Sequence, residues 1–376
     1  MVTYLDHAAS TPMRPEAMEA MRPYLDGMYA NPAGAHRFAR QARQAIDEAR
    51  DEVAAIVGCT AGEVIFTAGG TEADNAAILG AVRRSGGVAV CPAAEHHAVL
   101  HCVEHAKGVV VGVDQFGAVD VEALERVLVD ESVDVTVVSV MAVNNEVGTI
   151  TPLAEVSRLV RKHRPNALLH SDAVQAACWL DLRAVSALVD SISLSSHKFG
   201  GPKGVGVLTL RAGHHLEPLI HGGGQERDRR SGTQNTAGIV ATARALAITD
   251  AERTSEVTRL DALGARLSSG ITAVIDDAIT TVPRDRRVPG VVHMCFPGVE
   301  NEALLFLLDE SDVCASAASA CASGAMEPSH VLAAMGVSRA LAHGALRMSI
   351  GHTTTDDDID RAIDVVSASV QRLRNR

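Results

Sequence analysis

Apolar residues recur along the chain with two different periods, which predict alternating helices and strands. Between Arg37 and Val57 they stand four and three residues apart, on one face of a helix that Gly58 ends. Residues 63–67 form a short apolar run, followed by a glycine turn and a helical pattern from Glu72. Further apolar runs precede helical patterns at residues 88–90, 109–111 and 133–143. Strands that alternate with helices predict an α/β fold, a mostly parallel sheet with helices on both faces.

The pattern changes in the second half of the chain. Two apolar runs flank a loop around Lys198, and a long helical stretch over residues 237–274 follows. The remainder predicts a smaller α+β unit, with a last helix from Ile359 behind Thr354 and three aspartates. We therefore expect a large domain over residues 15–255 and a small domain made of residues 1–14 and 256–376.

Composition narrows the classes of function. The 376 residues carry a net charge of -12, which argues against direct nucleic-acid binding because phosphate contacts need clustered Lys and Arg. The seven cysteines show no CxxC spacing, so we expect a reducing, cytoplasmic setting. No apolar run approaches the ~20 residues of a membrane span, and no signal peptide is visible. We expect a protein that does not bind membranes.

The loop around Lys198 is the first candidate for chemistry. Its glycines, at 200, 201 and 204, let the backbone approach a ligand, and hydroxyl residues and a histidine adjoin the lysine. A desolvated lysine loses its charge and attacks carbonyl groups. The alternative for any lone lysine is an exposed surface position.

Asp172 is the second candidate for chemistry, and it follows the apolar run at residues 167–170. A carboxylate at the end of a buried strand needs a cationic partner, and a protonated pyridine nitrogen is one such partner. A helix N-cap is an equally good reading of this aspartate alone.

Other polar residues stand beyond the ends of the remaining strands. Gly70 and Thr71 open a helix and suit a phosphate, although glycine turns without a ligand are common. His96 suits the face of a flat ring, whereas adjacent His96 and His97 seldom bind one metal, so we expect no metal site. Together the candidates match every part of pyridoxal phosphate: Lys198 its aldehyde, Asp172 the pyridine nitrogen, Gly70, Thr71, Ser195 and His197 the phosphate, His96 the ring face, Asn145 and Gln175 the phenolic oxygen.

Motifs in order along nearly the whole chain now show a family resemblance. They include Tyr4-Leu-Asp-His-Ala-Ala9, Gly70-Thr-Glu72, Glu95-His96, Asn144-Asn-Glu-Val-Gly148, His170-Ser-Asp172, Ser196-His-Lys198, Arg230-Ser-Gly-Thr233, Ser319-Ala-Cys321 and Leu346-Arg-Met-Ser-Ile-Gly351. The sequence resembles cysteine desulfurases of the NifS/IscS type, fold-type I pyridoxal phosphate enzymes of the class-V aminotransferase family.

The resemblance implies an activity and further residues. L-cysteine would become L-alanine, and its sulfur would pass as a persulfide on Cys321 to an acceptor protein in iron–sulfur assembly, tRNA thiolation or DNA phosphorothioation. Lys198, Cys321 and His96 would be catalytic, and Arg347, with Asn31 and Asn145, would hold the substrate carboxylate. Thr233 would reach the partner's cofactor across a homodimer. A selenocysteine lyase or another pyridoxal phosphate lyase of this fold is the alternative.

One residue departs from the family pattern. Ala318 stands where the usual segment before the cysteine has glycine. Alanine restricts the backbone, so we expect a stiffer loop around Cys321.

Overall fold

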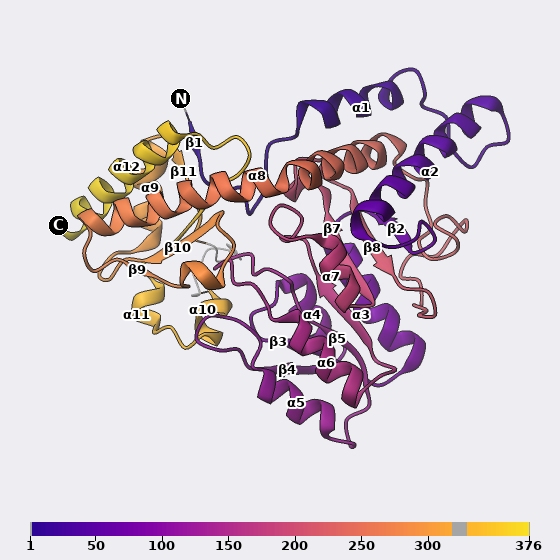
Figure 1. The fold of residues 1–376 in the computed structure, drawn as a ribbon, viewed down its shortest axis with the longest axis horizontal. Helices are drawn as coiled ribbons and strands as arrows, with labels where there is room; N and C mark the ends of the chain where they lie inside the picture. Colours follow the sequence, from indigo (N-terminus) through magenta and orange to yellow (C-terminus); the bar gives the residue numbers. More distant parts are fainter. Residues whose placement is uncertain (1, 318–328, 376) are drawn as a thin grey trace.

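The computed structural model describes residues 2–317 and 329–375, so Ala318 and Cys321 lie outside the described residues. Its large sheet has seven strands in the order β2-β8-β7-β6-β5-β3-β4 (Figure 1). Their bounds are β2 Val64–Thr67, β3 Val88–Pro92, β4 Val109–Val111, β5 Val135–Ser139, β6 Leu168–Asp172, β7 Ser191–Ser195 and β8 Gly206–Leu210.

Strand direction in this sheet follows the length of each connection. Neighbours from β4 to β7 pair in parallel, because a helix carries the chain back between them. Strand β8 instead follows β7 after a short loop and pairs antiparallel to β7 and to β2. The predicted α/β fold with a mostly parallel sheet is confirmed.

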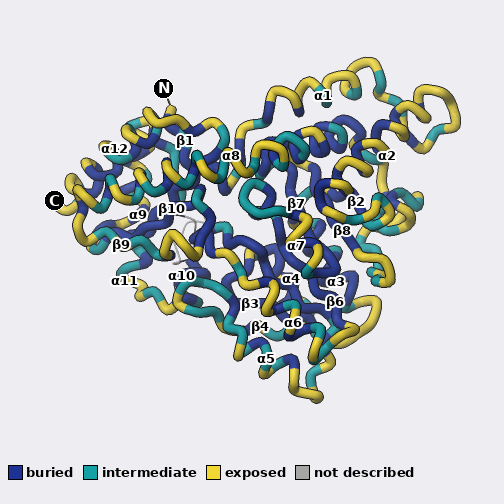
Figure 2. The backbone as a smooth tube through the Cα atoms, in the orientation of Figure 1, coloured by how far each residue is buried: buried dark blue, intermediate teal, exposed yellow. Residues whose placement is uncertain are grey.

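Helices cover both faces of the large sheet. Successive strand residues alternate between two apolar clusters: Val64 and Phe66 pack on one face and Ile65 on the other. Helices α3 and α4 cover the face of Ile65, and the remaining helices of this part cover the opposite face. Figure 2 shows the strands buried between these layers. The helix bounds are α1 Pro15–Leu25, α2 Arg37–Val57, α3 Gly70–Ser85, α4 His97–His105, α5 Val121–Val129, α6 Leu153–His163, α7 Leu182–Leu188 and α8 Thr236–Val274.

The C-terminal part surrounds two smaller sheets. An antiparallel sheet has the order β12-β10-β9, and the N-terminal β1 pairs in parallel with β11, so both termini lie at the same end of the molecule (Figure 1). The elements are β1 Thr3–Tyr4, β9 Ile279–Thr280, β10 Val291–Cys295, α9 Asn301–Glu310, β11 Val313–Cys314, α10 His330–Ala334, α11 Arg339–Ala342, β12 Ala345–Ser349 and α12 Asp356–Arg374, with single 3₁₀ turns at Ser196–Lys198 and Arg284–Arg286.

Helix α8 joins the two parts. It packs against α1 and α2 along one half and against α12 and β10 along the other. The domain boundary expected at residue 255 falls inside this helix. The division at that residue stays a prediction.

Local signals set several boundaries. Helix α2 ends at Gly58, whose φ of 80° is left-handed, as the sequence predicts. The expected start of the last helix was wrong by a few residues: Thr355, not Thr354, caps α12 through the amide of Asp358, and the helix begins at Asp356. The apolar run 133–143 forms a strand only over Val135–Ser139. In the described part of the chain, no helix combines the length and apolarity needed to cross a membrane.

Candidate active site

A cavity of about 740 Å³ opens where the strands of the large sheet end. Parallel strands direct their carboxyl ends to one edge, and the residues that follow β2, β3, β5, β6 and β7 meet there. Of the residues predicted from the sequence, those that line this cavity are Gly70, Thr71, His96, Asn145, Asp172, Gln175, Ser195, His197, Lys198 and Arg347.

Lys198 lies at the cavity wall, at the end of the 3₁₀ turn that follows β7. Its Nζ donates to the carbonyl oxygens of Ala8 at 2.6 Å and Ala9 at 2.9 Å. Burial lowers the pKa of Lys198 to about 8, and Arg347 acts in the same direction, while Asp172 and Asp6 oppose the shift. A lysine with this pKa has a far larger neutral fraction near neutral pH than an ordinary lysine, and a carbonyl-capturing nucleophile reacts through that neutral form.

Asp172 lines the cavity and is 5% exposed. Its Oδ1 accepts a hydrogen bond from the Val174 amide at 2.9 Å. Burial raises the pKa of Asp172 to about 6, against the opposing effects of that amide and of Lys198. A buried carboxyl in this state gains from a cationic ligand, because such a ligand restores the charge that burial disfavours.

Two further buried carboxyl groups lie close to Asp172. Burial raises the pKa of Asp74, with the charge of Asp172 adding to the shift, and burial likewise raises the pKa of Glu95. Asp74 Oδ1 and Glu95 Oε2 have no hydrogen-bond partner among the described residues. Since three like charges cannot share this volume cheaply, burial and the charge of Asp172 both favour the neutral acid forms of Asp74 and Glu95.

The end of the cavity at β2 suits an anion. Helix α3 begins at Gly70 without a side-chain cap, so its first amides face the cavity with Thr71 beside them. A Cβ on Gly70 would lie 2.7 Å from Val174 Cγ2, so only glycine fits there. Ser195 Oγ and His197 Nδ1 share a hydrogen bond of 3.0 Å at the same end.

The middle of the cavity carries the predicted ring contacts. His96 Nδ1 accepts from the Ala98 amide at 3.1 Å, and loss of hydration lowers the pKa of His96 to about 4, so the ring is neutral and carries its proton on Nε2. Asn145 Oδ1 is buried without a partner among the described residues. Gln175 Nε2 donates to the Ala8 carbonyl at 2.8 Å.

Arg347 enters the cavity from β12, in the C-terminal part of the chain. Its Nη1 donates to the Asn145 carbonyl at 2.9 Å, and its Nη2 donates to Asp6 Oδ1 at 2.6 Å. The site therefore combines strand ends of the large sheet with one residue from the small antiparallel sheet and one turn of the N-terminal segment.

Two predicted residues that the structure describes are not brought to this cavity. Asn31 lies on an exposed turn, where its Oδ1 accepts from the Ala33 amide, and Thr233 is also exposed. Neither lines the cavity of the single chain. Cys321 lies outside the described residues.

Sequence reasoning missed the part played by the N-terminal turn. The carbonyls of Ala8 and Ala9 bind Lys198, and the carboxylate of Asp6 binds Arg347. A backbone carbonyl leaves no signal in the sequence, but Asp6 belongs to a motif that the family resemblance already marked.

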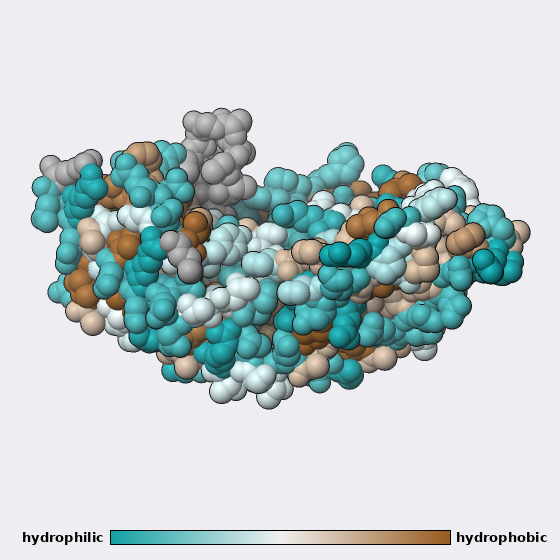
Figure 3. Space-filling model, turned by 90° about the horizontal axis from the view of Figure 1, so that it is seen from above, coloured by the Kyte–Doolittle hydropathy of each residue, from teal (hydrophilic) through white to brown (hydrophobic). Residues whose placement is uncertain are grey.

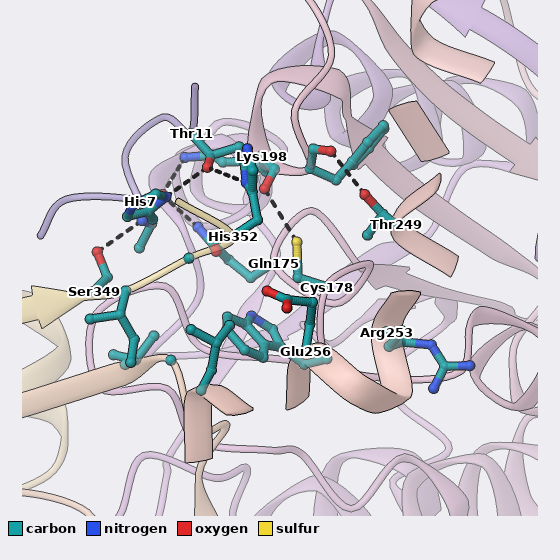
Figure 4. A pocket seen from close by; sticks show the side chains of 18 of the residues that line it. His7, Thr11, Gln175, Cys178, Lys198, Thr249, Arg253, Glu256, Ser349 and His352 are labelled. Atoms are coloured by element: carbon teal, nitrogen blue, oxygen red, sulfur yellow. Dashed lines mark hydrogen bonds between the residues drawn. The ribbon is translucent and has the colours of Figure 1, made fainter. Parts of the chain in front are cut away.

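A second cavity, of about 40 Å³, shares Ala8, Gln175 and Lys198 with the first (Figure 4). Cys178 lies beside it, with Sγ 3.5 Å from the Lys198 carbonyl. A water molecule needs at least ~10–15 Å³ by this measure, so the space suits a few waters and excludes a cofactor. The larger cavity is thus the candidate active site.

Comparison with known proteins identifies the family. The model of the family described as "Aminotransferase class-V" matches residues 3–362. The chain belongs to the aminotransferase class-V family. This match and the relatives described next confirm the resemblance that the motifs indicated. The names of those relatives narrow the family to one activity.

Curated and solved relatives agree with one another. A protein named "IscS-like cysteine desulfurase" from Mycobacterium tuberculosis is 43% identical over 99% of this chain and 97% of its own length. A "Cysteine desulfurase IscS" from Dictyoglomus turgidum is 39% identical over 99% of this chain and 95% of its own length. A solved structure titled "NIFS-LIKE PROTEIN" superposes with a TM-score of 0.92 at 34% identity, over 99% of this chain and 100% of that one.

The residues of this class-V chain fit pyridoxal phosphate better than a metal. An uncapped helix end and a buried acid at Asp172 face one cavity, where the phosphate and the protonated ring nitrogen of the cofactor would satisfy them. Among residues 2–317 and 329–375, no group of three or more His, Cys, Asp or Glu is placed to hold a metal ion.

Proposed function

We propose that this chain is a pyridoxal phosphate-dependent cysteine desulfurase that converts L-cysteine to L-alanine and passes the sulfur to Cys321. The observation that carries the proposal is that Lys198, with its lowered pKa, and the buried Asp172 line one cavity. The full-length relatives named as cysteine desulfurases support the choice of substrate.

Each residue of the cavity has a proposed task. Lys198 holds the cofactor through its amine and takes the proton from the substrate Cα. Asp172 pairs with the pyridine nitrogen. The amides of Gly70 and Thr71, with Ser195 and His197, bind the phosphate. When bound, pyridoxal phosphate supplies an electron-withdrawing ring that makes the Cα proton acidic and the Cβ–sulfur bond breakable.

The neutral state of His96 suits a contact with the flat cofactor ring. Its Nδ1 is occupied by the Ala98 amide, which leaves the Nε2 proton for donation. We propose that His96 packs on the ring and donates this proton near the reacting carbon. Asn145 and Gln175 bind the phenolic oxygen, and Gln175 changes its partner from the Ala8 carbonyl to do so.

Arg347 is the proposed anchor of the substrate carboxylate, because its planar guanidinium binds carboxylates through two parallel hydrogen bonds. Near Arg347, Ser316 exchanges backbone hydrogen bonds with it at 3.1 and 2.7 Å. Farther along the chain, Ser329 binds the Glu146 carboxylate, next to Asn145. The described residues on both sides of the segment with Cys321 therefore contact residues of the site or their neighbours, which supports Cys321 as the sulfur acceptor.

The sulfur step balances with these groups alone. The Cys321 thiolate attacks the substrate sulfur, the Cβ–sulfur bond breaks and a sulfur–sulfur bond forms. The electron pair of the broken bond goes to Cβ, which takes a proton and becomes the methyl group of alanine. A downstream acceptor protein, in iron–sulfur assembly, tRNA thiolation or DNA phosphorothioation, then receives the persulfide sulfur.

We also propose a homodimer. Large apolar side chains of α1, α2 and their connection are exposed, including Tyr29 at 82%, with Met18, Leu25 and Phe38. Figure 3 shows that apolar side chains elsewhere on the visible face are dispersed among hydrophilic ones. Asn31 and Thr233, which lie outside the cavity of their own chain, would then act at the partner's site. Sedimentation velocity tests this: a monomer at micromolar concentration would contradict it.

The activity is tested by quantifying alanine. Protein reconstituted with pyridoxal phosphate and supplied with L-cysteine and a thiol reductant should release alanine and sulfide in equal amounts. Selenocysteine is tested in parallel, because a selenocysteine lyase would turn it over while leaving cysteine intact. A protein that binds the cofactor but forms no alanine from cysteine would overturn the proposal.

A further inference from the structure

The guanidinium of Arg347 is only partly satisfied in the ligand-free site. Arginine has five N–H donors. Nη1 donates to the Asn145 carbonyl at 2.9 Å and Nη2 to Asp6 Oδ1 at 2.6 Å, while Nε is buried without a partner among the described residues. Arg347 as a whole is 5% exposed and lines the cavity. The buried Nε cannot be reached from the cavity, so the second N–H groups of Nη1 and Nη2 are the donors that remain for a ligand oxygen.

A carboxylate that binds Nη1 also meets Nη2, since bidentate recognition uses two adjacent nitrogens of the fork. Nη2 is the atom that already binds Asp6. The substrate carboxylate and the Asp6 carboxylate must therefore share one guanidinium, with two negative charges side by side.

The backbone of Asp6 is held in place by several hydrogen bonds. Its carbonyl accepts hydrogen bonds from the Ala9 amide at 3.0 Å, the Ser10 amide at 3.3 Å and the Tyr4 hydroxyl at 3.1 Å. The residue also forms a β-bridge with Ser349, two positions beyond Arg347 on the same segment. The backbone of Asp6 thus stays beside β12, which keeps its carboxylate within reach of Arg347.

The same turn reaches Lys198. Ala8 and Ala9, which follow Asp6, supply the two carbonyl oxygens that bind Lys198 Nζ. Arg347 lowers the pKa of Lys198, whereas Asp6 raises it. The charge of Asp6 therefore acts on both the anchor and the lysine.

We propose that Asp6 is a positioning residue that fixes the orientation of the Arg347 guanidinium and, by its negative charge, limits how tightly the site holds a carboxylate. Because Asp6 offsets part of the positive charge of Arg347, the oriented guanidinium still recognises the shape of a carboxylate but holds it less tightly. The amino-acid product is then released readily. The inference rests on the proposed role of Arg347 as the substrate anchor.

The test is the binding of propionate, a carboxylate without an amine, to the enzyme loaded with pyridoxal phosphate, measured by isothermal titration calorimetry at fixed ionic strength. Asp6→Asn keeps an oxygen acceptor and removes the charge, so it should bind propionate more tightly by on the order of tenfold. Asp6→Ala also frees the guanidinium and should bind propionate more weakly than Asp6→Asn. Ethylamine, which has no carboxylate, should not gain affinity.

Asp261→Asn is the matched control, because Asp261 forms an Asp–Arg pair with Arg284 on the surface, remote from the cavity lining. It should bind propionate as the unmodified enzyme does.

A second readout separates the effect of charge from an effect on folding. The pH midpoint of the visible absorption of the bound cofactor should fall in Asp6→Asn, because the charge of Asp6 raises the pKa at Lys198. In steady-state kinetics, KM for L-cysteine should fall without a rise in kcat.

The outcomes distinguish this inference from the function it rests on. If Arg347→Gln loses propionate binding but Asp6→Asn binds it no more tightly than the unmodified enzyme, the role of Asp6 is wrong and that of Arg347 stands. If Arg347→Gln binds propionate normally, the anchor assignment is wrong and this inference falls with it. An unchanged pH midpoint in Asp6→Asn would also contradict the proposal.

Discussion

Glu226 forms the most completely buried arginine–carboxylate pair of the described residues. Its replacement by glutamine is a sensitive test of what holds β2 at the edge of the cavity. The side chains of Arg50 and Glu226 are 6% and 1% exposed. The two carboxylate oxygens accept from Arg50 at 2.7 and 2.8 Å, from the Phe66 amide at 3.0 Å and from Gln234 at 2.5 Å. Phe66 belongs to β2, the strand that leads directly into the glycine turn at Gly69 and Gly70.

The expected cost follows from the burial of the partner that remains. Glu226→Gln keeps the shape of the side chain, but it replaces one acceptor oxygen with an NH₂ group and leaves the Arg50 cation uncompensated. Removing one partner of a buried pair costs about 3–5 kcal/mol. The hydrogen bond from Arg50 to the Val64 carbonyl, at 2.8 Å, is retained, so we expect about 3 kcal/mol.

The assay is equilibrium unfolding in urea followed by circular dichroism. The control, Asp261→Asn, breaks an exposed pair and should cost no more than about 1 kcal/mol. A double variant, Arg50→Met with Glu226→Leu, should be less destabilised than Glu226→Gln, because it leaves no buried charge. If Glu226→Gln lowers the free energy of unfolding as little as the surface control does, burial of this ion pair does not set its cost.

Other predictions concern the cavity itself. Lys198→Ala should abolish turnover and the lysine-dependent visible absorption of bound cofactor in spectrophotometry, and survival of either contradicts its assignment. Asp172→Asn keeps the shape and removes the charge, so turnover should fall on the order of a hundredfold or more while cofactor still binds; unchanged kcat/KM would exclude its pairing with the ring nitrogen. Burial raises the pKa of Glu146 from 4.5 to about 7, so its contribution to stability is complete below pH 4.5 and is lost as pH rises through about 7. Glu146→Gln, which can still bind Ser329, should remove this decline from the pH profile of the thermal midpoint, and an unaltered profile would show that another group causes it.

The sequence predicts the α/β layers well because periodicity reports burial directly. The helix over residues 37–57 and the helix over 153–163 have the bounds that their apolar spacing indicates. The last helix was misplaced because Thr354 and Thr355 are adjacent threonines before the same acidic run, and only the geometry decides which hydroxyl meets the amide of Asp358.

The site could be predicted as far as it consists of residues at strand ends. Asp172 and His96 follow apolar runs, and parallel strands bring such positions to one edge. The pairing of Asp6 with Arg347 could not be predicted, because 341 residues separate them and their meeting depends on the N-terminal segment lying against β12. The roles of Ala8 and Ala9 depend on backbone carbonyls, which any residue provides.

Transfer of the substrate sulfur to Cys321 is the central claim, and mass spectrometry of the peptide that carries this residue tests it most directly. The enzyme loaded with pyridoxal phosphate is incubated with L-cysteine without reductant, quenched and digested. The account predicts that this peptide gains the mass of one sulfur atom, that alanine appears in equal amount, and that dithiothreitol removes the added sulfur. Cys321→Ser should form no such adduct and turn over no cysteine. Alanine production at the original rate by Cys321→Ser, or sulfur found instead on Cys178 or Cys314, would contradict it.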